Sequence, residues 1–182
     1  MKNIPVVMTF SGHDPSGGAG IQADIEVLAS QGCHATPVIT ALTVQDTRDV
    51  VDFTPLAASH VITQARAVLE DMPVAAFKIG MLGSVENAQA IHTILQDYPQ
   101  LPLVLDPILA SGGGTQLGAA NLSAAINTLL LPRTNVLTPN SLEARALAPE
   151  ADTLEACALA LLDKGAGHVL LTGTHENTRH VV

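Results

Sequence analysis

The chain has 182 residues, of which 47% are hydrophobic and 14% are charged, and this balance excludes a disordered protein and favours one domain with a buried core. Its net charge of −9 argues against nucleic acid or an anionic membrane surface as the main partner. Two distant cysteines, Cys33 and Cys157, favour a reducing, cytoplasmic compartment, and no apolar run approaches the roughly 18 residues of a membrane span.

The N-terminal segment predicts a strand, a glycine-rich loop and a helix. The apolar run 4–10 precedes ten residues with four glycines, after which Ile21, Ile25 and Leu28 recur at helical spacing. Glycines let the backbone approach a bound group closely, and the first N–H groups of a helix attract anions or polar ligands. We therefore expect a binding loop here, with an ordinary strand-to-helix turn as the alternative.

Two common nucleotide-binding motifs do not account for this loop. A P-loop is excluded because no lysine occurs between Lys2 and Lys78. Gly18, Gly20 and Ala23 have the spacing of a dinucleotide fingerprint, but they begin eight residues after the predicted strand. The acidic residue expected about 20 residues further on is also missing. A nicotinamide site, and with it an oxidoreductase, stays a minor alternative.

The rest of the chain alternates predicted strands with predicted helices. The strands cover 34–42, 75–79, 102–105, 135–137 and 168–171, and the helices cover 55–72, 84–97, 121–131, a short segment around Glu143, and 153–164. The strands are apolar throughout, which is typical of a sheet covered by helices on both faces. The sequence therefore predicts a doubly wound α/β fold with a mainly parallel sheet, in a single domain 1–182.

Ligands of such sheets bind beyond the carboxyl ends of the strands, so polar residues at predicted strand ends are the candidate site residues. These residues are Gly12, His13, Asp14, Gln45, Lys78, Gly80, Met81, Asp106, Asn140, Glu143, Thr172 and Gly173. Further along, 179–182 predicts the start of another strand, and an unpaired apolar half-strand is an unusual natural terminus. We therefore expect the C-terminal part of the domain to be missing from this sequence.

Five segments resemble one known family. They are Ser-Gly-His-Asp-Pro-Ser-Gly-Gly-Ala-Gly-Ile-Gln-Ala-Asp (11–24), Val-Ile-Thr-Ala-Leu-Thr-Val-Gln-Asp-Thr (38–47), Lys-Ile-Gly-Met-Leu (78–82), Val-Leu-Asp-Pro (104–107) and Leu-Thr-Pro-Asn-Ser-Leu-Glu-Ala (137–144). In this order they are similar to the hydroxymethylpyrimidine/phosphomethylpyrimidine kinases of thiamine biosynthesis, which have a ribokinase-like fold. The resemblance implies a homodimer that uses ATP and Mg²⁺ to phosphorylate 4-amino-5-hydroxymethyl-2-methylpyrimidine or its monophosphate.

The resemblance also implies the substrate-binding residues. Gln45 is expected to hydrogen-bond the aminopyrimidine ring, because an amide both donates and accepts, and Asp24 is expected near the hydroxymethyl or amino group. The other pocket residues are the backbone of Gly12 and Met81 and the apolar walls Val44 and Ile108. A turn-capping role for Gln45 and simple core packing for Met81 are the alternatives.

On the phosphate side, the resemblance makes Asp106 and Glu143 the carboxylates that place Mg²⁺, with Asn140 near the nucleotide. Oxygen ligands of this kind suit Mg²⁺ as it bridges phosphates. A strand-terminating Asp106 and a solvated Glu143 are the alternatives. Thr172 takes the cofactor-side position at which the family has a lysine near the ATP phosphates, so that charge is absent here.

The glycine-rich anion hole of the family, with its catalytic residue, is expected after Val182. Ser111–Gly114 does not replace it, because this loop holds no candidate base. The 182-residue chain is therefore expected to bind a pyrimidine better than it phosphorylates one. The alternatives are a pyridoxal-type kinase, whose substrate also carries a hydroxymethyl group on an aromatic ring, and a noncatalytic pyrimidine-binding protein.

Overall fold

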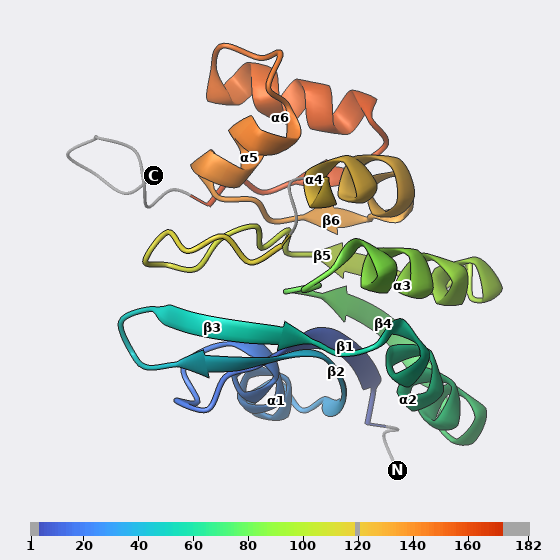
Figure 1. Ribbon diagram of the computed structural model, residues 1–182. Coiled ribbons are helices and arrows are strands. Elements are labelled where there is room, and N and C mark those ends of the chain that lie inside the picture. The colour runs from blue at the N-terminus through green and yellow to red at the C-terminus, as the bar shows by residue number, and fades with distance from the viewer. Residues whose placement is uncertain (1–3, 119–120, 173–182) are drawn as a thin grey trace.

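The computed structural model describes residues 4–118 and 121–172, and the predicted strand start at 179–182 lies outside them. The described strands form one seven-stranded sheet in the order β3-β2-β1-β4-β5-β6-β7 (Figure 1). The strands are β1 (Val6–His13), β2 (His34–Gln45), β3 (Val50–Pro55), β4 (Val74–Ile79), β5 (Leu103–Leu105), β6 (Val136–Leu137) and β7 (His168–Val169). The pairs are parallel except β2–β3, so the predicted mainly parallel α/β sheet is confirmed.

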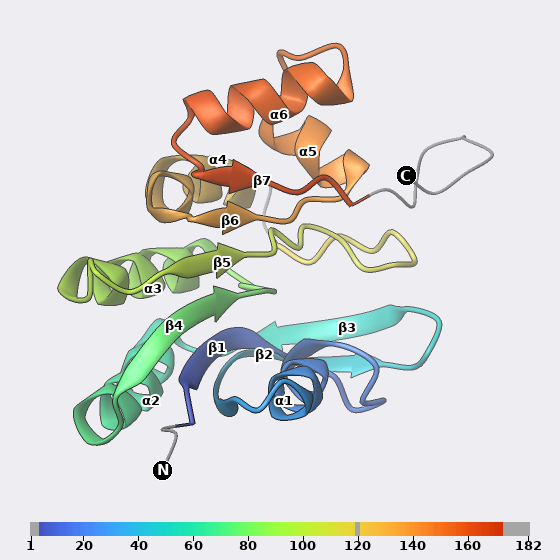
Figure 2. The same ribbon diagram turned by 180° about the vertical axis from the view of Figure 1, so that it is seen from behind.

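Helices cover both faces of the sheet. They are α1 (Gly20–Ser30), α2 (Ala58–Asp71), α3 (Val85–Asp97), α4 (Leu122–Ala125), α5 (Ser141–Leu147) and α6 (Leu154–Asp163). Helix α1 packs on β1 and β2, whereas α2, α3 and α4 lie side by side on the opposite face (Figures 1 and 2). None of the described helices is long and apolar enough to cross a membrane.

Three elements differ most from the prediction, namely β3, α2 and the predicted helix 121–131. The segment 50–55 forms β3, an antiparallel edge strand, and α2 begins three residues after Pro55 rather than at it. A turn at Asp46 creates this hairpin, because Asp46 Oδ1 accepts the backbone N–H groups of Arg48 and Asp49 at 2.8 and 3.1 Å. The predicted helix 121–131 starts as α4 and continues as a π-helical turn and then a 3-10 turn as far as Arg133.

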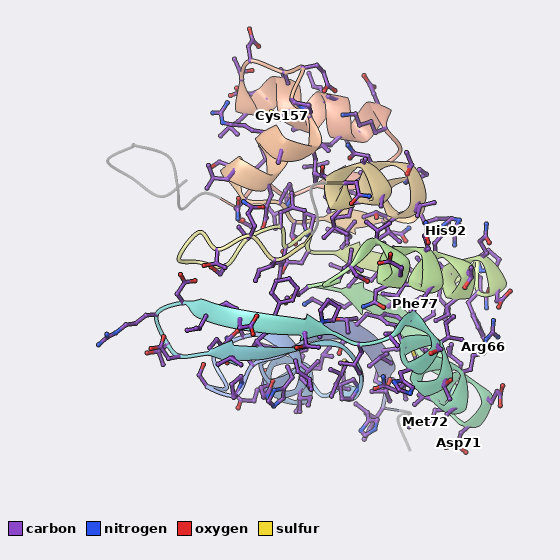
Figure 3. The ribbon with its side chains drawn as sticks, in the orientation of Figure 1. Arg66, Asp71, Met72, Phe77, His92 and Cys157 are labelled. Carbon is purple, nitrogen blue, oxygen red and sulfur yellow. The ribbon has the colours of Figure 1, made fainter. Side chains whose placement is uncertain are left out.

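The main core lies between the sheet and the α2–α4 layer. Phe77 of β4 is fully buried there, with ring centroids 6.1 Å from Phe10 and 6.3 Å from Tyr98 (Figure 3). A second, smaller cluster of buried apolar side chains is separate from this core. Its members are Ala41, Val50, Met81 and Leu117, with Phe53 and Ile108 packed against them. This second cluster joins the β2–β3 hairpin to the loop after β5.

Candidate functional site

A cavity of about 310 Å³ opens at the carboxyl ends of the parallel strands. Its walls come from the end of β1, the glycine-rich loop, the end of β2, the segments after β4 and β5, and the start of α5. Most of the site residues predicted from the sequence line this cavity. They are Gly12, His13, Asp14, Gln45, Met81, Asp106, Ile108, Asn140, Glu143 and Thr172.

Four of the described candidate residues do not line the cavity, namely Asp24, Val44, Lys78 and Gly80. Side chains alternate along β2, so Val44 points away from Gln45, and 60% of it is exposed to solvent. Thr43, rather than Val44, belongs to the cavity wall. Asp24 lies on α1 and forms an ion pair with Lys78 instead of facing the cavity openly.

Asp14 organises the glycine-rich loop. Its carboxylate accepts the backbone N–H and the hydroxyl of Ser16 at 2.7 and 2.8 Å, and the backbone N–H of Ala19 at 2.8 Å. Partial burial opposes ionisation, yet these bonds and one from Gln45 hold the pKa of Asp14 below its usual value. Asp14 is therefore a charged anchor at the start of α1, and the Gln45 side chain lies beside it.

The loop also folds back closely on β1. Gly20 has a φ of +59°, and a Cβ there would lie 2.2 Å from the carbonyl oxygen of Gly12. Because that separation is far below any van der Waals contact, only glycine permits this closure. On the other side, a Cβ at Gly12 would lie 2.9 Å from Met81 Sδ, so these two residues meet in the cavity wall.

A buried polar cluster lies behind the cavity wall. Lys78 Nζ is 3.0 Å from Asp24 Oδ1, and a Cβ at Gly80 would lie within 2.8 Å of both Lys78 Nζ and Ser11 Oγ. Ser11 Oγ and Asp24 Oδ2 are buried with no hydrogen-bond partner among the described residues. Buried polar atoms are normally paired, so these two atoms mark a place where a ligand or water completes the hydrogen bonding.

Two carboxylates, the half-buried Asp106 and the buried Glu143, line the other side of the cavity. Asp106 follows β5, and burial raises its pKa while Lys78 opposes that rise. Burial also raises the pKa of Glu143 to about 7, with the charge of Asp106 adding to the effect and a hydrogen bond from Asn140 opposing it. Glu143 is 7% exposed, so it does not belong to a solvated helix face.

Local capping explains the position of Glu143. Asn140 Oδ1 accepts the backbone N–H of Glu143 at 2.9 Å, and Glu143 Oε2 accepts the backbone N–H of Asn140 at 2.9 Å. This capping box fixes both side chains at the start of α5. Thr172 lies beside them, because its N–H donates to the carbonyl of Pro139 at 2.9 Å.

A second cavity, of about 530 Å³, adjoins the first. It lies between the loop after β5 and α5, and it shares Asn140 and Glu143 with the first cavity. Glu143 therefore lies in the wall between the two neighbouring cavities. The predicted substrate-binding residues Gln45 and Met81 line only the first of them.

Lys78 is a candidate site residue because it lies at a predicted strand end, but the sequence assigns it no partner, and Ser11 is not among the candidates. Lys78 is also a charged residue inside an otherwise apolar strand, which is a second signal of a special role. Its partner Asp24 is more than fifty residues away in the sequence, so only the fold shows the pair. Ser11 carries no such signal, because serines are common at strand ends.

Comparisons with known proteins show which family this chain is similar to. The family model for phosphomethylpyrimidine kinase matches residues 14–182. The hydroxymethylpyrimidine/phosphomethylpyrimidine kinase of Haemophilus influenzae is 38% identical over 179 residues, covering 96% of this chain and 66% of that protein. The Escherichia coli kinase of the same name is 37% identical over 180 residues, covering 96% and 67%. The chain thus spans about two thirds of the length of these relatives.

Solved structures agree. Phosphomethylpyrimidine kinase from Clostridium difficile superposes with a TM-score of 0.86 at 32% identity, covering 97% of this chain and 78% of that one. The pyridoxal kinase from Staphylococcus aureus in complex with pyridoxal gives 0.83 at 29% identity, covering 94% and 65%. From the family match over residues 14–182 and these two sets of relatives, the chain belongs to the phosphomethylpyrimidine kinase family and has its ribokinase-like fold.

Proposed function

We propose that this protein binds 4-amino-5-hydroxymethyl-2-methylpyrimidine or its monophosphate and takes part in its ATP-dependent phosphorylation. The observation that carries the proposal is that one cavity brings together the Gln45 amide and the carboxylates of Asp106 and Glu143. The first is a group that recognises a pyrimidine edge, and the other two are groups that hold a metal–phosphate assembly. The sequence similarity to kinases of this name supports the same substrate class.

On the substrate side, Gln45 orients the ring through its ability to donate and accept at adjacent ring positions. Ile108 supplies apolar surface for the flat ring, and in this proposal the Met81 side chain takes the second wall that was expected from Val44. The unpartnered oxygens Ser11 Oγ and Asp24 Oδ2 offer acceptors for an amino or hydroxymethyl group. In this proposal Asp24, which is not itself a lining residue of the cavity, contacts the ligand through Oδ2, while Lys78 holds Oδ1 in the ion pair.

On the phosphate side, Asp106 and Glu143 fit a divalent cation because they are a half-buried and a buried carboxylate, and the charge of Asp106 raises the pKa of Glu143. The described residues contain no group of three or more His, Cys, Asp or Glu side chains placed to hold a metal, so phosphate oxygens and water complete the coordination. When bound, Mg²⁺ neutralises charge on the transferring phosphoryl group. Asn140 and Thr172 lie beside these carboxylates, next to the second cavity, and are proposed to contact the nucleotide.

We also propose that the anion hole and catalytic residue of the full reaction lie after Val182. Phosphoryl transfer depends on positioning and charge neutralisation, and the described residues supply these for the acceptor and the metal. The 182-residue protein is then expected to bind the pyrimidine with little or no turnover of ATP. Full kinase activity of this form would contradict this part of the proposal.

A pyridoxal-type kinase is the second candidate function. The observation in its favour is the superposition on Staphylococcus aureus pyridoxal kinase, a structure that contains pyridoxal. Calorimetric titration with the hydroxymethylpyrimidine, repeated with pyridoxal as competitor, separates the two candidates. Saturable binding of the pyrimidine that pyridoxal does not displace supports the first proposal. Stronger binding of pyridoxal supports the second, and binding of neither overturns both.

A cytoplasmic homodimer completes the proposal. Both cysteines are free thiols, which suits a reducing compartment.

The proposed dimer is supported by apolar side chains at the edge of the sheet. The β2–β3 hairpin exposes Leu42, Val44 and Val51 there. Analytical ultracentrifugation tests the dimer, and a monomer at micromolar concentration would contradict it.

A further inference from the structure

Asp49, at the turn between β2 and β3, contacts a loop that lies far away in the sequence. Asp49 Oδ1 accepts the hydroxyl of Ser111, and Oδ2 accepts the hydroxyl of Thr115 at 3.1 Å. Oδ1 also accepts the backbone N–H of Val50 at 2.7 Å, a local bond that sets the rotamer of the carboxylate. One side chain of the hairpin therefore binds both ends of the segment 111–115.

The segment that Asp49 binds is a small hairpin of its own, the loop 109–117. The N–H of Ser111 donates to the carbonyl of Thr115 at 2.8 Å, and the N–H of Thr115 donates to Ser111 Oγ at 2.9 Å. A Cβ at Gly113 would lie 2.2 Å from Asp49 Cγ, so the loop meets the carboxylate at a residue without a side chain. In Figure 1 this yellow loop and the β2–β3 hairpin extend from the same end of the sheet.

The contact lies over the ligand cavity. Val50, Ser111, Gly112 and Leu117 all line that cavity, and they come from the two segments that Asp49 joins. Beneath them, the second apolar cluster packs Val50 and Leu117 against Met81. The apolar contacts hold the base of the loop, whereas Asp49 holds its tip.

We propose that Asp49 is a positioning residue that fixes the loop 109–117 over the cavity, so that ligand enters and leaves when this contact opens. Hydrogen bonds from Ser111 and Val50 hold the pKa of Asp49 below its usual value, so the carboxylate is charged at neutral pH. Hydrogen bonds to a charged acceptor are stronger than those between neutral groups. The bonds to Asp49 can therefore hold this short loop in one conformation although it contains three glycines. The ligand part of this inference rests on the proposed function; the loop part does not.

Hydrogen–deuterium exchange on the 182-residue protein without ligand tests the loop. In Asp49→Ala, amides of the loop 109–117 should exchange on the order of tenfold faster. Asp49→Asn should restore part of the protection, because its amide oxygen still accepts from Val50 and Ser111 and its NH₂ donates to Thr115 Oγ1. Asp52→Ala removes another, exposed carboxylate of the same hairpin and should change nothing in the loop.

Gly113→Ala is an independent variant that leaves the carboxylate in the protein. Its new methyl group occupies the place of the Asp49 carboxyl group, so it should raise exchange in the same amides. Unchanged loop exchange in both Asp49→Ala and Gly113→Ala would overturn the proposal. A uniform rise across the whole sheet would also overturn it, because that result reports general destabilisation rather than loss of a local contact.

Stopped-flow binding of the hydroxymethylpyrimidine tests the ligand part. Asp49→Ala should raise the association and dissociation rates together, on the order of tenfold each, with a smaller change in Kd. A change in only one of the two rates, with Kd changing by the same factor, would contradict a positioning role. If the unmodified protein does not bind the pyrimidine, the proposed function fails, and the exchange experiment still decides whether Asp49 holds the loop.

Discussion

Lys78 Nζ lies 3.0 Å from Asp24 Oδ1, and this ion pair joins β4 to α1 directly behind the ligand cavity. Both side chains are mostly buried, with 22% and 13% of their surfaces exposed. Removing one partner of a buried pair leaves the other charge uncompensated. We therefore predict that Lys78→Met lowers the free energy of unfolding by about 3 kcal/mol, measured by urea denaturation.

A surface pair on the same protein provides the control. Arg66 Nη2 and Asp97 Oδ2 are 2.6 Å apart and join α2 to α3, but both side chains are about half exposed (Figure 3 labels Arg66). Arg66→Met should have little effect, because solvent screens exposed pairs. The double variant Lys78→Met/Asp24→Asn should recover part of the loss. Equal effects of Lys78→Met and Arg66→Met would contradict the prediction.

Gln45→Ala tests ring recognition. Losing a buried hydrogen-bonding partner should weaken binding of the hydroxymethylpyrimidine by about 1 to 3 kcal/mol, or roughly 5- to 150-fold, in calorimetric titration. Val44→Ala is the matched control, because the adjacent side chain points out of the cavity and is 60% exposed. If Val44→Ala weakens pyrimidine binding more than Gln45→Ala does, Val44 lines the cavity after all, and the prediction is wrong.

Glu143→Gln tests the buried carboxylate. Its pKa is about 7 in the folded protein and 4.5 in the reference state, so folding favours the protonated form. The contribution of Glu143 to stability is therefore fully present below pH 4.5 and is lost as the pH rises to about 7. We predict that Glu143→Gln equals the unmodified protein at pH 4 and exceeds it in stability at pH 8.

Gln suits this test because its carbonyl oxygen can still accept the N–H of Asn140, which keeps the capping box. Thermal or urea unfolding at several pH values gives the difference between the two proteins, and other titrating groups cancel in that difference. A variant that is less stable at pH 8 than at pH 4, relative to the unmodified protein, would show that Glu143 is stabilised as an anion.

Magnesium should bind the two carboxylates. At pH 8, Mg²⁺ at about ten times its dissociation constant should stabilise the unmodified protein by about 1.4 kcal/mol, seen as a melting temperature about 4 °C higher. Asp106→Asn should lose most of this increase, because it removes one of the two charged oxygen ligands. NaCl at equal ionic strength is the control, and an equal shift in Asp106→Asn would place the metal elsewhere.

Strand ends are the part of the site that sequence predicts well. Apolar runs end visibly at Asp106 and before Asn140, and parallel strands bring such ends together at one edge. The capping of α5 is also visible, since Asn140 and Glu143 have the spacing of a capping box. The structure therefore confirms that these residues share a cavity, while their ligands stay predictions.

The faces of β2 could not be predicted in the same way. Thr40 is buried while Leu42 and Val44 are exposed. The pattern of polar and apolar residues along β2 therefore predicts the opposite of the observed burial. The pairing of β2 also shifts register against both neighbouring strands, at Ser11/Gly12 in β1 and at Val44/Gln45 in β2 itself. Because of such shifts, the spacing of residues in the sequence does not tell which face of the sheet a side chain is on. The β3 strand was missed because a short edge strand with Asp52 in it gives little apolar signal.

The strand order has a consequence for synthesis of the protein. β2 and β4 both pair with β1, and from there β5, β6 and β7 are each added beside the strand that precedes them in the chain. A growing chain can thus fold its first eighty residues and extend one edge of the sheet as translation continues. The cavity residues from Gly12 to Met81 can therefore be in place before the ribosome has joined Asp106 and Glu143 to the chain.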